Sequence, residues 1–123
     1  MTEDANVETA KRAYEAFGRG DAEAALEAIA DDVEWIVPGQ STIGGTYNGK
    51  QEVAEFWGRL GEKNFTTTPE YWFSDGERVV VLTHVTMEGG EADAADVLTY
   101  RDGKLVKFQT AGDTALFERV FGS

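Results

Sequence analysis

The chain has no cysteine, a single histidine and only two prolines among its 123 residues. Without cysteine it can form no disulfide, no thiolate nucleophile and no cysteine-bound metal site. The same absence agrees with a reducing compartment, so the cytoplasm is the expected location. No metal-binding motif is present elsewhere in the sequence, and we expect no cofactor.

Basic side chains are also scarce, with 11 Lys and Arg against 23 Asp and Glu and a formal net charge of −12. A strongly negative chain repels nucleic-acid phosphates and anionic lipid surfaces. Long apolar runs are missing too, because stretches such as residues 79–82 are far shorter than the roughly 20 residues of a membrane span. We therefore expect a soluble protein with neither a nucleic-acid nor a membrane partner.

The length suits one domain covering residues 1–123, since a core of this size buries roughly two-thirds of the unfolded surface. Apolar residues at three- and four-residue steps predict an amphipathic helix from about residue 6 to Gly18. Asp21 is expected to cap a second, alanine-rich helix that ends near Ala30. A β-prone run over 33–37 and an irregular loop over 41–49 lead to a third helix over 51–60.

After residue 65 the pattern changes to strands. Strand-forming segments around 71–73, 79–87, 97–100 and 105–110 are separated by Asp-Gly or Gly-Gly turns, which join antiparallel neighbours. The segment 113–121 is amphipathic and can pack back as a short helix or tail. Helices followed by a hairpin-linked sheet define an α+β protein.

Several short strings occur in an order that resembles a known family. They are AYEAF at 13–17 before Gly20-Asp21, DDVEW at 31–35, GTYNG at 45–49, DGKL at 102–105 and GDT at 112–114. Together they are similar to the NTF2-like superfamily, in particular its SnoaL-like branch, which is related to ketosteroid isomerases. The resemblance implies a cone in which three N-terminal helices pack on a curved antiparallel sheet that is mixed at the first strand. It also implies a cavity for a small hydrophobic molecule, and a homodimer formed through the outer face of the sheet.

The single histidine, His84, is one candidate for chemistry. Counting by twos from Val80 places it on the same strand face as Leu82, and the resemblance implies that this face lines the cavity. A neutral imidazole there could accept or donate a proton near pH 7. The alternative is an ordinary strand histidine that bonds a neighbour or faces solvent.

Asp96 is a second candidate because it is a charged residue among small and apolar neighbours in a predicted strand. By resemblance it matches the ketosteroid isomerase carboxylic acid that donates a hydrogen bond to an enolate oxygen. The alternatives are an acid paired with a basic residue or one on the outer face.

Two departures argue against ketosteroid isomerisation itself. Val37 stands where that family places its proton-shuttling aspartate, and Ala13 matches the family tyrosine, with Tyr14 one residue along. Asp113 instead matches the aspartate that SnoaL-type cyclases use as general acid and base. An aspartate before Thr and Ala is equally suited to cap the closing helix.

An aromatic-rich cavity would suit a hydrophobic ligand. The expected lining residues are Tyr14, Phe17, Trp35, Phe56, Trp57, Trp72, Leu82 and Phe108. We therefore predict a cofactor-independent enzyme of the isomerase, cyclase or dehydratase type that transfers protons on a hydrophobic carbonyl compound, using Asp113 and Asp96 assisted by His84. The alternatives are a non-catalytic binding domain with the same pocket and a dimeric interaction module whose own aromatics fill the cavity.

Overall fold

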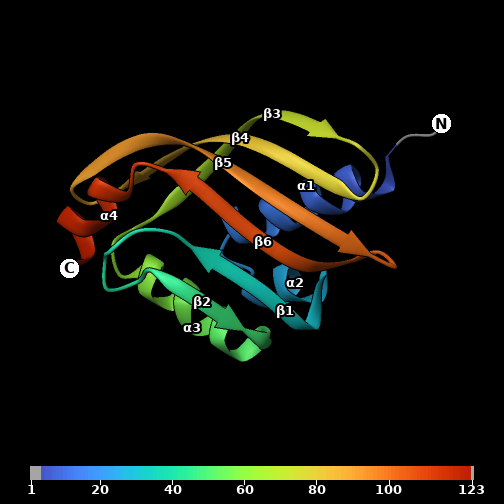
Figure 1. Cartoon of the computed structure of the whole chain (residues 1–123), viewed down its shortest axis with the longest axis horizontal. Coiled ribbons are helices and arrows are strands. Elements are labelled where there is room, and N and C mark those ends of the chain that lie inside the picture. Colours follow the sequence, from blue (N-terminus) through green and yellow to red (C-terminus); the bar gives the residue numbers. More distant parts are fainter. Residues whose placement is uncertain (1–3, 123) are drawn as a thin grey trace.

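The computed structural model describes residues 4–122, which form four helices and one six-stranded sheet (Figure 1). The helices are α1 (Ala5–Gly18), α2 (Ala22–Glu27), α3 (Gly49–Gly61) and α4 (Thr114–Phe121). The strands are β1 (Ile29–Val37), β2 (Gly45–Asn48), β3 (Thr66–Ser74), β4 (Arg78–Met87), β5 (Gly90–Arg101) and β6 (Lys104–Gly112). Within these described residues, no helix combines the length and apolar character needed to cross a bilayer.

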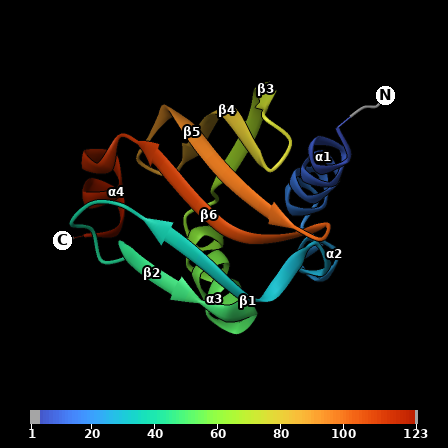
Figure 2. The same ribbon diagram turned by 45° about the vertical axis from the view of Figure 1, so that its right-hand side comes forward.

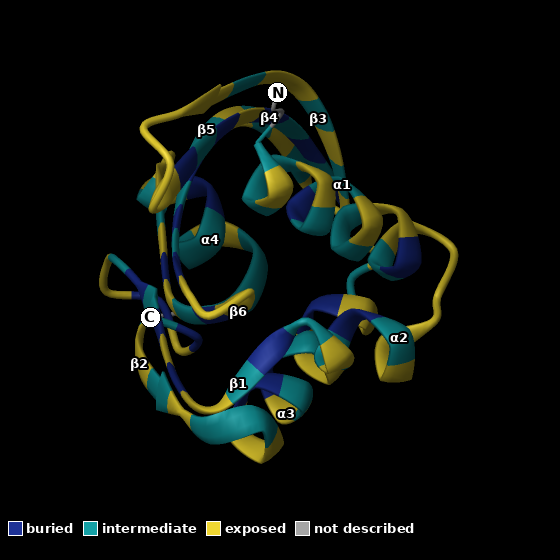
Figure 3. Ribbon diagram, turned by 90° about the vertical axis from the view of Figure 1, so that its right-hand side faces the viewer, coloured by how far each residue is buried: buried dark blue, intermediate teal, exposed yellow. Residues whose placement is uncertain are grey.

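The sheet has the order β2-β1-β6-β5-β4-β3. Strands β3 to β6 form the antiparallel meander that the Asp-Gly and Gly-Gly turns predict. β1 then pairs in parallel with β6 and antiparallel with β2, which confirms a sheet that is mixed at its first strand. α1 and α2 lie at one end of the sheet and α4 at the other (Figure 2). The curved sheet wraps around the helices (Figure 3), as in an α+β cone.

Aspartates begin three of these helices, because a helix N-terminus leaves backbone N–H groups without partners. Asp4 accepts hydrogen bonds from the backbone N–H groups of Asn6 and Val7 at the start of α1. Asp21 caps α2 through Ala24 N at 3.1 Å. Aspartate side chains thus define where α1, α2 and α4 start.

The core lies between the helices and the concave face of the sheet. Val33, Val53, Val79 and Val81 are completely buried in it. Aromatic residues extend this core, and the rings of Trp35 and Phe108 stack at a centroid distance of 3.7 Å and an interplanar angle of 11°. This stack joins opposing residues of β1 and β6. It therefore packs side chains across the parallel strand pair.

Several boundaries differ from the sequence prediction, and β1, β3 and β5 all extend beyond the predicted segments 33–37, 71–73 and 97–100. α2 ends at Glu27 rather than near Ala30, because Ile29 starts β1 and pairs with Leu105. The segment expected as an irregular loop contains β2, which pairs with residues 34–37 of β1. In both places the partner strand supplies hydrogen bonds that local propensity does not reveal.

Candidate functional site

An apolar cavity of about 120 Å³ lies inside the cone. Its walls come from α1, α2 and α3, from the concave face of the sheet, and from α4. Aromatic side chains line this space and leave it unfilled, which disfavours an interaction module with a filled interior. An apolar cavity of about 150 Å³ holds a benzene molecule, so the size here suits a ligand built on one ring.

Asp96 is the charged residue most deeply placed in this wall. Along β5 the inward positions alternate, so Asp96 faces the cavity together with Ala94 and Leu98. Its residue exposure is 6 %. Burial raises the pKa of Asp96 above its ordinary value, and hydrogen bonds from Tyr14 and Thr110 oppose that shift. Asp96 therefore keeps its proton to a higher pH than an exposed aspartate does.

Both carboxyl oxygens of Asp96 are bonded to hydroxyl groups. The Tyr14 hydroxyl donates to Oδ2 at 2.5 Å, and the Thr110 hydroxyl donates to Oδ1 at 2.8 Å. Thr110 lies directly opposite Asp96 in the β5–β6 register, whereas Tyr14 reaches it from α1. Three elements thus hold one carboxyl group in place.

The Tyr14 ring packs edge-on against the Trp72 ring, with a centroid distance of 5.6 Å and an interplanar angle of 88°. Burial raises the pKa of the Tyr14 hydroxyl well above its ordinary value, and the neighbouring Asp96 raises it further. Tyr14 therefore remains a neutral hydrogen-bond donor at all ordinary pH values. In the sequence, Ala13 occupies the position of the family tyrosine. In the structure, Tyr14 supplies a hydroxyl to the site because its side chain reaches Asp96.

Asp113 lies at the rim of the cavity, between β6 and α4, and is exposed. Its Oδ1 accepts a hydrogen bond from the backbone N–H of Leu116 at 3.1 Å. The capping interpretation of Asp113 is therefore confirmed. Oδ2 has no hydrogen bond within residues 4–122 and is free to act on a ligand. Val37 also lines the cavity and, as expected, provides no proton acceptor there.

His84 and Leu82 do not line the cavity, so the predicted inward placement of both is wrong. The buried residues of β4 are the odd-numbered ones from Val79 to Met87, which puts His84 and Leu82 on the outer face. Apolar residues occupy both faces of β4 around positions 79–82, and the alternation could not identify the inner one.

On that outer face the His84 ring lies between two acids of β5. Its Nδ1 is 2.9 Å from Asp93 Oδ1, and its Nε2 is 2.7 Å from Glu91 Oε1. The hydrogen bonds to Asp93 and Glu91 raise the pKa of His84 above its ordinary value of 6.5. The alternative of a strand histidine bonded to its neighbours is thus confirmed.

The His84 contacts predict a pH-dependent stability. Because the folded-state pKa is raised, the contribution of His84 is fully present below pH 6.5 and is lost as the pH rises through the folded-state pKa. The free energies of unfolding of the wild type and His84→Gln should therefore differ at pH 5.5 and converge at high pH. Urea titrations at several pH values check this, with NMR titration of the imidazole as the direct measurement. An imidazole pKa at or below 6.5 would contradict it.

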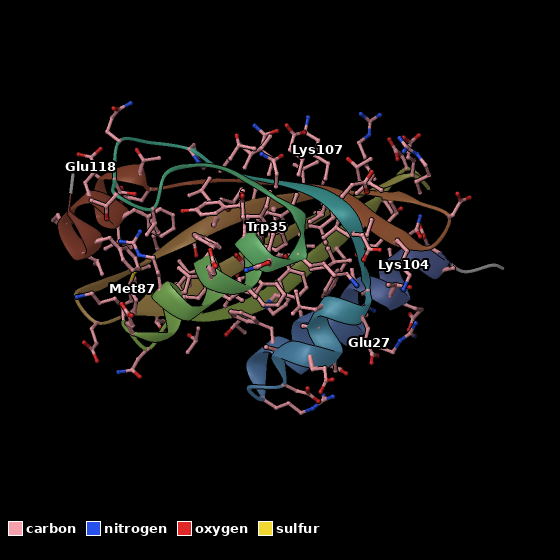
Figure 4. The ribbon with its side chains drawn as sticks, turned by 90° about the horizontal axis from the view of Figure 1, so that it is seen from below. Glu27, Trp35, Met87, Lys104, Lys107 and Glu118 are labelled. Carbon is pink, nitrogen blue, oxygen red and sulfur yellow. The ribbon has the colours of Figure 1, made fainter. Side chains whose placement is uncertain are left out.

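The predicted aromatic lining is found for most residues. The cavity is lined by Tyr14, Phe17, Trp35, Phe56, Trp57 and Phe108. Trp72 packs against Tyr14 and is not part of the wall. Figure 4 shows Trp35 among the side chains between α3 and the sheet. Sequence reasoning missed Thr110 and Tyr100, although two-residue alternation from Asp96 would have placed Tyr100 on the inward face.

In the described part of the chain, no group of three or more His, Asp or Glu side chains has an arrangement that could hold a metal ion. What the cavity offers instead is a buried carboxyl group, two hydroxyls bonded to it and a carboxylate at the rim. Such a set can donate hydrogen bonds to a ligand oxygen and accept a proton nearby.

An α+β cone with a ligand-sized cavity defines the class of this protein, and comparisons with known proteins define its family. A family model described as the SnoaL-like domain matches residues 10–108. The chain therefore belongs to the SnoaL-like family of NTF2-like proteins. An uncharacterized protein of Mycobacterium tuberculosis is 36 % identical over 123 residues, covering 96 % of this chain and 90 % of its own length.

Two solved structures illustrate the similarity. An NTF2-like protein of unknown function from Burkholderia pseudomallei is 31 % identical, with a TM-score of 0.85 and 100 % of both chains covered. TerC, co-crystallized with polyporic acid, is 28 % identical, with a TM-score of 0.83 and coverage of 97 % of this chain and 99 % of that one.

Proposed function

We propose that this protein binds a small ring-bearing carbonyl compound and, without a cofactor, catalyses proton transfer at the carbon next to the carbonyl group. The observation that carries the proposal is the Asp96 carboxyl, which is 6 % exposed within an apolar cavity and hydrogen-bonded to two hydroxyls. Burying a carboxyl group is costly, and groups with shifted pKa values gather at functional sites. The co-crystal of the similar protein TerC with polyporic acid supports a small-molecule ligand for the fold.

The proposed reaction uses two carboxyl groups, the buried Asp96 as a hydrogen-bond donor and the exposed Asp113 as a proton acceptor. Protonated Asp96, held by hydrogen bonds from Tyr14 and Thr110, can donate its own O–H to the carbonyl oxygen. When the adjacent C–H bond breaks, its proton passes to the Asp113 carboxylate, its electrons form a C=C bond, and the carbonyl π electrons move to the oxygen. A neutral donor stabilises this enolate oxygen more strongly than the original carbonyl. Returning the proton to another carbon completes an isomerisation.

Hydrogen–deuterium exchange tests the proposal without knowledge of the natural substrate. The protein is incubated in D₂O with cyclohexanone or 2-cyclohexenone, and loss of the α-proton signal is followed by NMR. We expect exchange above the buffer rate for the wild type. Tyr14→Phe and Asp113→Asn should each slow the protein-dependent rate by about 10² or more. Asp31→Asn, an exposed acid outside the cavity lining, is the matched control. Equal rates in all variants would contradict the proposal.

A second candidate is a binding domain that performs no chemistry. Its supporting observation is that Asp113 is exposed and already used as a helix cap. In that case the ring ketones would bind, and their α-protons would exchange at the buffer rate.

We also propose a homodimer formed through the outer face of the sheet. Three large apolar side chains are exposed there: Tyr71 by 62 %, Phe73 by 56 % and Leu82 by 38 %. Tyr71 and Leu82 are cross-strand partners, so the exposed side chains form one patch. Apolar patches of this kind mark interaction surfaces.

The dimer is tested by Phe73→Asp, which would place a charge in the contact. Light scattering after size exclusion should give twice the chain mass for the wild type and a single chain mass for the variant. Gln51→Asp on α3 is the control. A monomeric wild type would exclude the dimer.

A further inference from the structure

We propose that Tyr100 is a second polar anchor in the cavity and that the ligand is therefore a single-ring compound with two oxygen functions. One oxygen would bind at Asp96, and the other at the Tyr100 hydroxyl. The inference rests on the proposed function for the first oxygen and adds a recognition point that selects the ligand.

Tyr100 is placed for this role by the alternation of β5. It is 4 % exposed, lines the cavity, and lies on the inward face four residues beyond Asp96. At about 3.3 Å per residue, the two Cα atoms are about 13 Å apart along the strand. Leu98 occupies the inward position between them. The wall thus presents a polar group, an apolar stretch and a second polar group in a row.

Within the described residues the Tyr100 hydroxyl has no partner, which is also true of Trp35 Nε1 and Thr67 Oγ1 in the same wall. Those two atoms are fully enclosed, whereas the Tyr100 oxygen is not, so a ligand can reach it. Among residues 4–122 it makes no hydrogen bond, whereas Tyr14 and Thr110 both use their hydroxyls on Asp96. Burial raises the pKa of Tyr100, so the group is a neutral hydroxyl that can donate as well as accept. Phenylalanine would fill the same space without a hydroxyl. A ligand oxygen in the cavity would give the Tyr100 hydroxyl a hydrogen bond that no described residue supplies.

Tyr14 and Tyr100 line the same cavity, so one ligand can contact both. A cavity of about 120 Å³ suits one ring between these two groups. Because a tyrosine hydroxyl both donates and accepts, the second oxygen can be a hydroxyl or a carbonyl. The ligand class is a cyclic hydroxyketone, diketone or dihydroxy compound.

The experiment uses phenol, resorcinol and hydroquinone as probes, because a phenol resembles an enol and carries its oxygen on an sp² carbon. Dissociation constants are measured by NMR chemical-shift titration for the wild type, Tyr100→Phe and Tyr14→Phe. We expect at least one of the two diphenols to bind the wild type about tenfold more tightly than phenol, the effect of one added hydrogen bond. In Tyr100→Phe this gain should disappear, with the affinity for phenol itself unchanged.

Each remaining outcome is informative. A gain that persists in Tyr100→Phe, the absence of any gain in the wild type, or no binding of any probe up to about 10 mM would overturn the inference. Tyr14→Phe should weaken the binding of phenol and of both diphenols by the same factor. If it does not, the proposed function is contradicted, whereas the inference on Tyr100 is still judged by comparing the wild type with Tyr100→Phe. Urea unfolding confirms that both variants are folded.

Discussion

Asp96→Asn is expected to raise the free energy of unfolding at pH 8, and this gain is expected to shrink as the pH falls toward 4. The folded-state pKa of Asp96 lies above its ordinary value of 3.8 because the carboxyl is buried. Ionising it therefore costs stability, and this cost is present above the folded-state pKa and vanishes as the pH falls toward 3.8. Asparagine is neutral throughout and retains groups that can bond Tyr14 and Thr110. Urea titrations from pH 4 to pH 8 measure the difference.

The same substitution should lower the rate of α-proton exchange by about 10² or more, because asparagine is a weaker donor to an enolate oxygen. A variant that is more stable and less active would show that Asp96 is retained for function at a cost in stability. Asp31→Asn again serves as the control, with neither effect expected. If Asp96→Asn lost stability equally at every pH from 4 to 8, the buried acid would be a structural hydrogen-bonding group and this interpretation would be wrong.

Trp35→Ala is expected to destabilise the protein by about 3–5 kcal/mol. The indole ring is 7 % exposed, stacks on Phe108 and meets Trp57 edge-on at 5.6 Å. Its removal takes away dispersion contacts with both rings and enlarges a cavity that is already open. For a domain whose total stability is about 5–15 kcal/mol, the loss is a large share. Urea unfolding at pH 7 provides the measurement.

Trp35→Phe is the matched comparison. A phenyl ring can preserve much of the stack on Phe108, and the substitution also removes an indole N–H that is buried without a partner. We expect it to cost about 1.5 kcal/mol or less. If the alanine and phenylalanine variants had the same stability, ring packing at this position would not contribute as the geometry indicates.

The sequence pattern predicted an element correctly where the residues of that element alone favour its structure. The apolar spacing of α1 and α3 and the Asp-Gly turns before β4 and β6 predicted both helices and the meander, because these features depend on neighbours along the chain. β2 has no such signal. It forms because its backbone groups pair with residues 34–37 of β1. The residues of the GTYNG segment do not by themselves reveal this partner.

The candidate site divides in the same way. Asp96 was identified by its apolar surroundings and Asp113 by a motif, and the sequence also determined the fold class, the three early helices and most of the aromatic lining. Only the tertiary structure decided that His84 and Leu82 face outward, since both faces of β4 carry apolar residues. It alone brought Tyr14 of α1 and Thr110 of β6 to Asp96, and left the Tyr100 hydroxyl unpaired. Such contacts depend on which strand face meets the helices, and the periodicity of a single strand is the same for either choice.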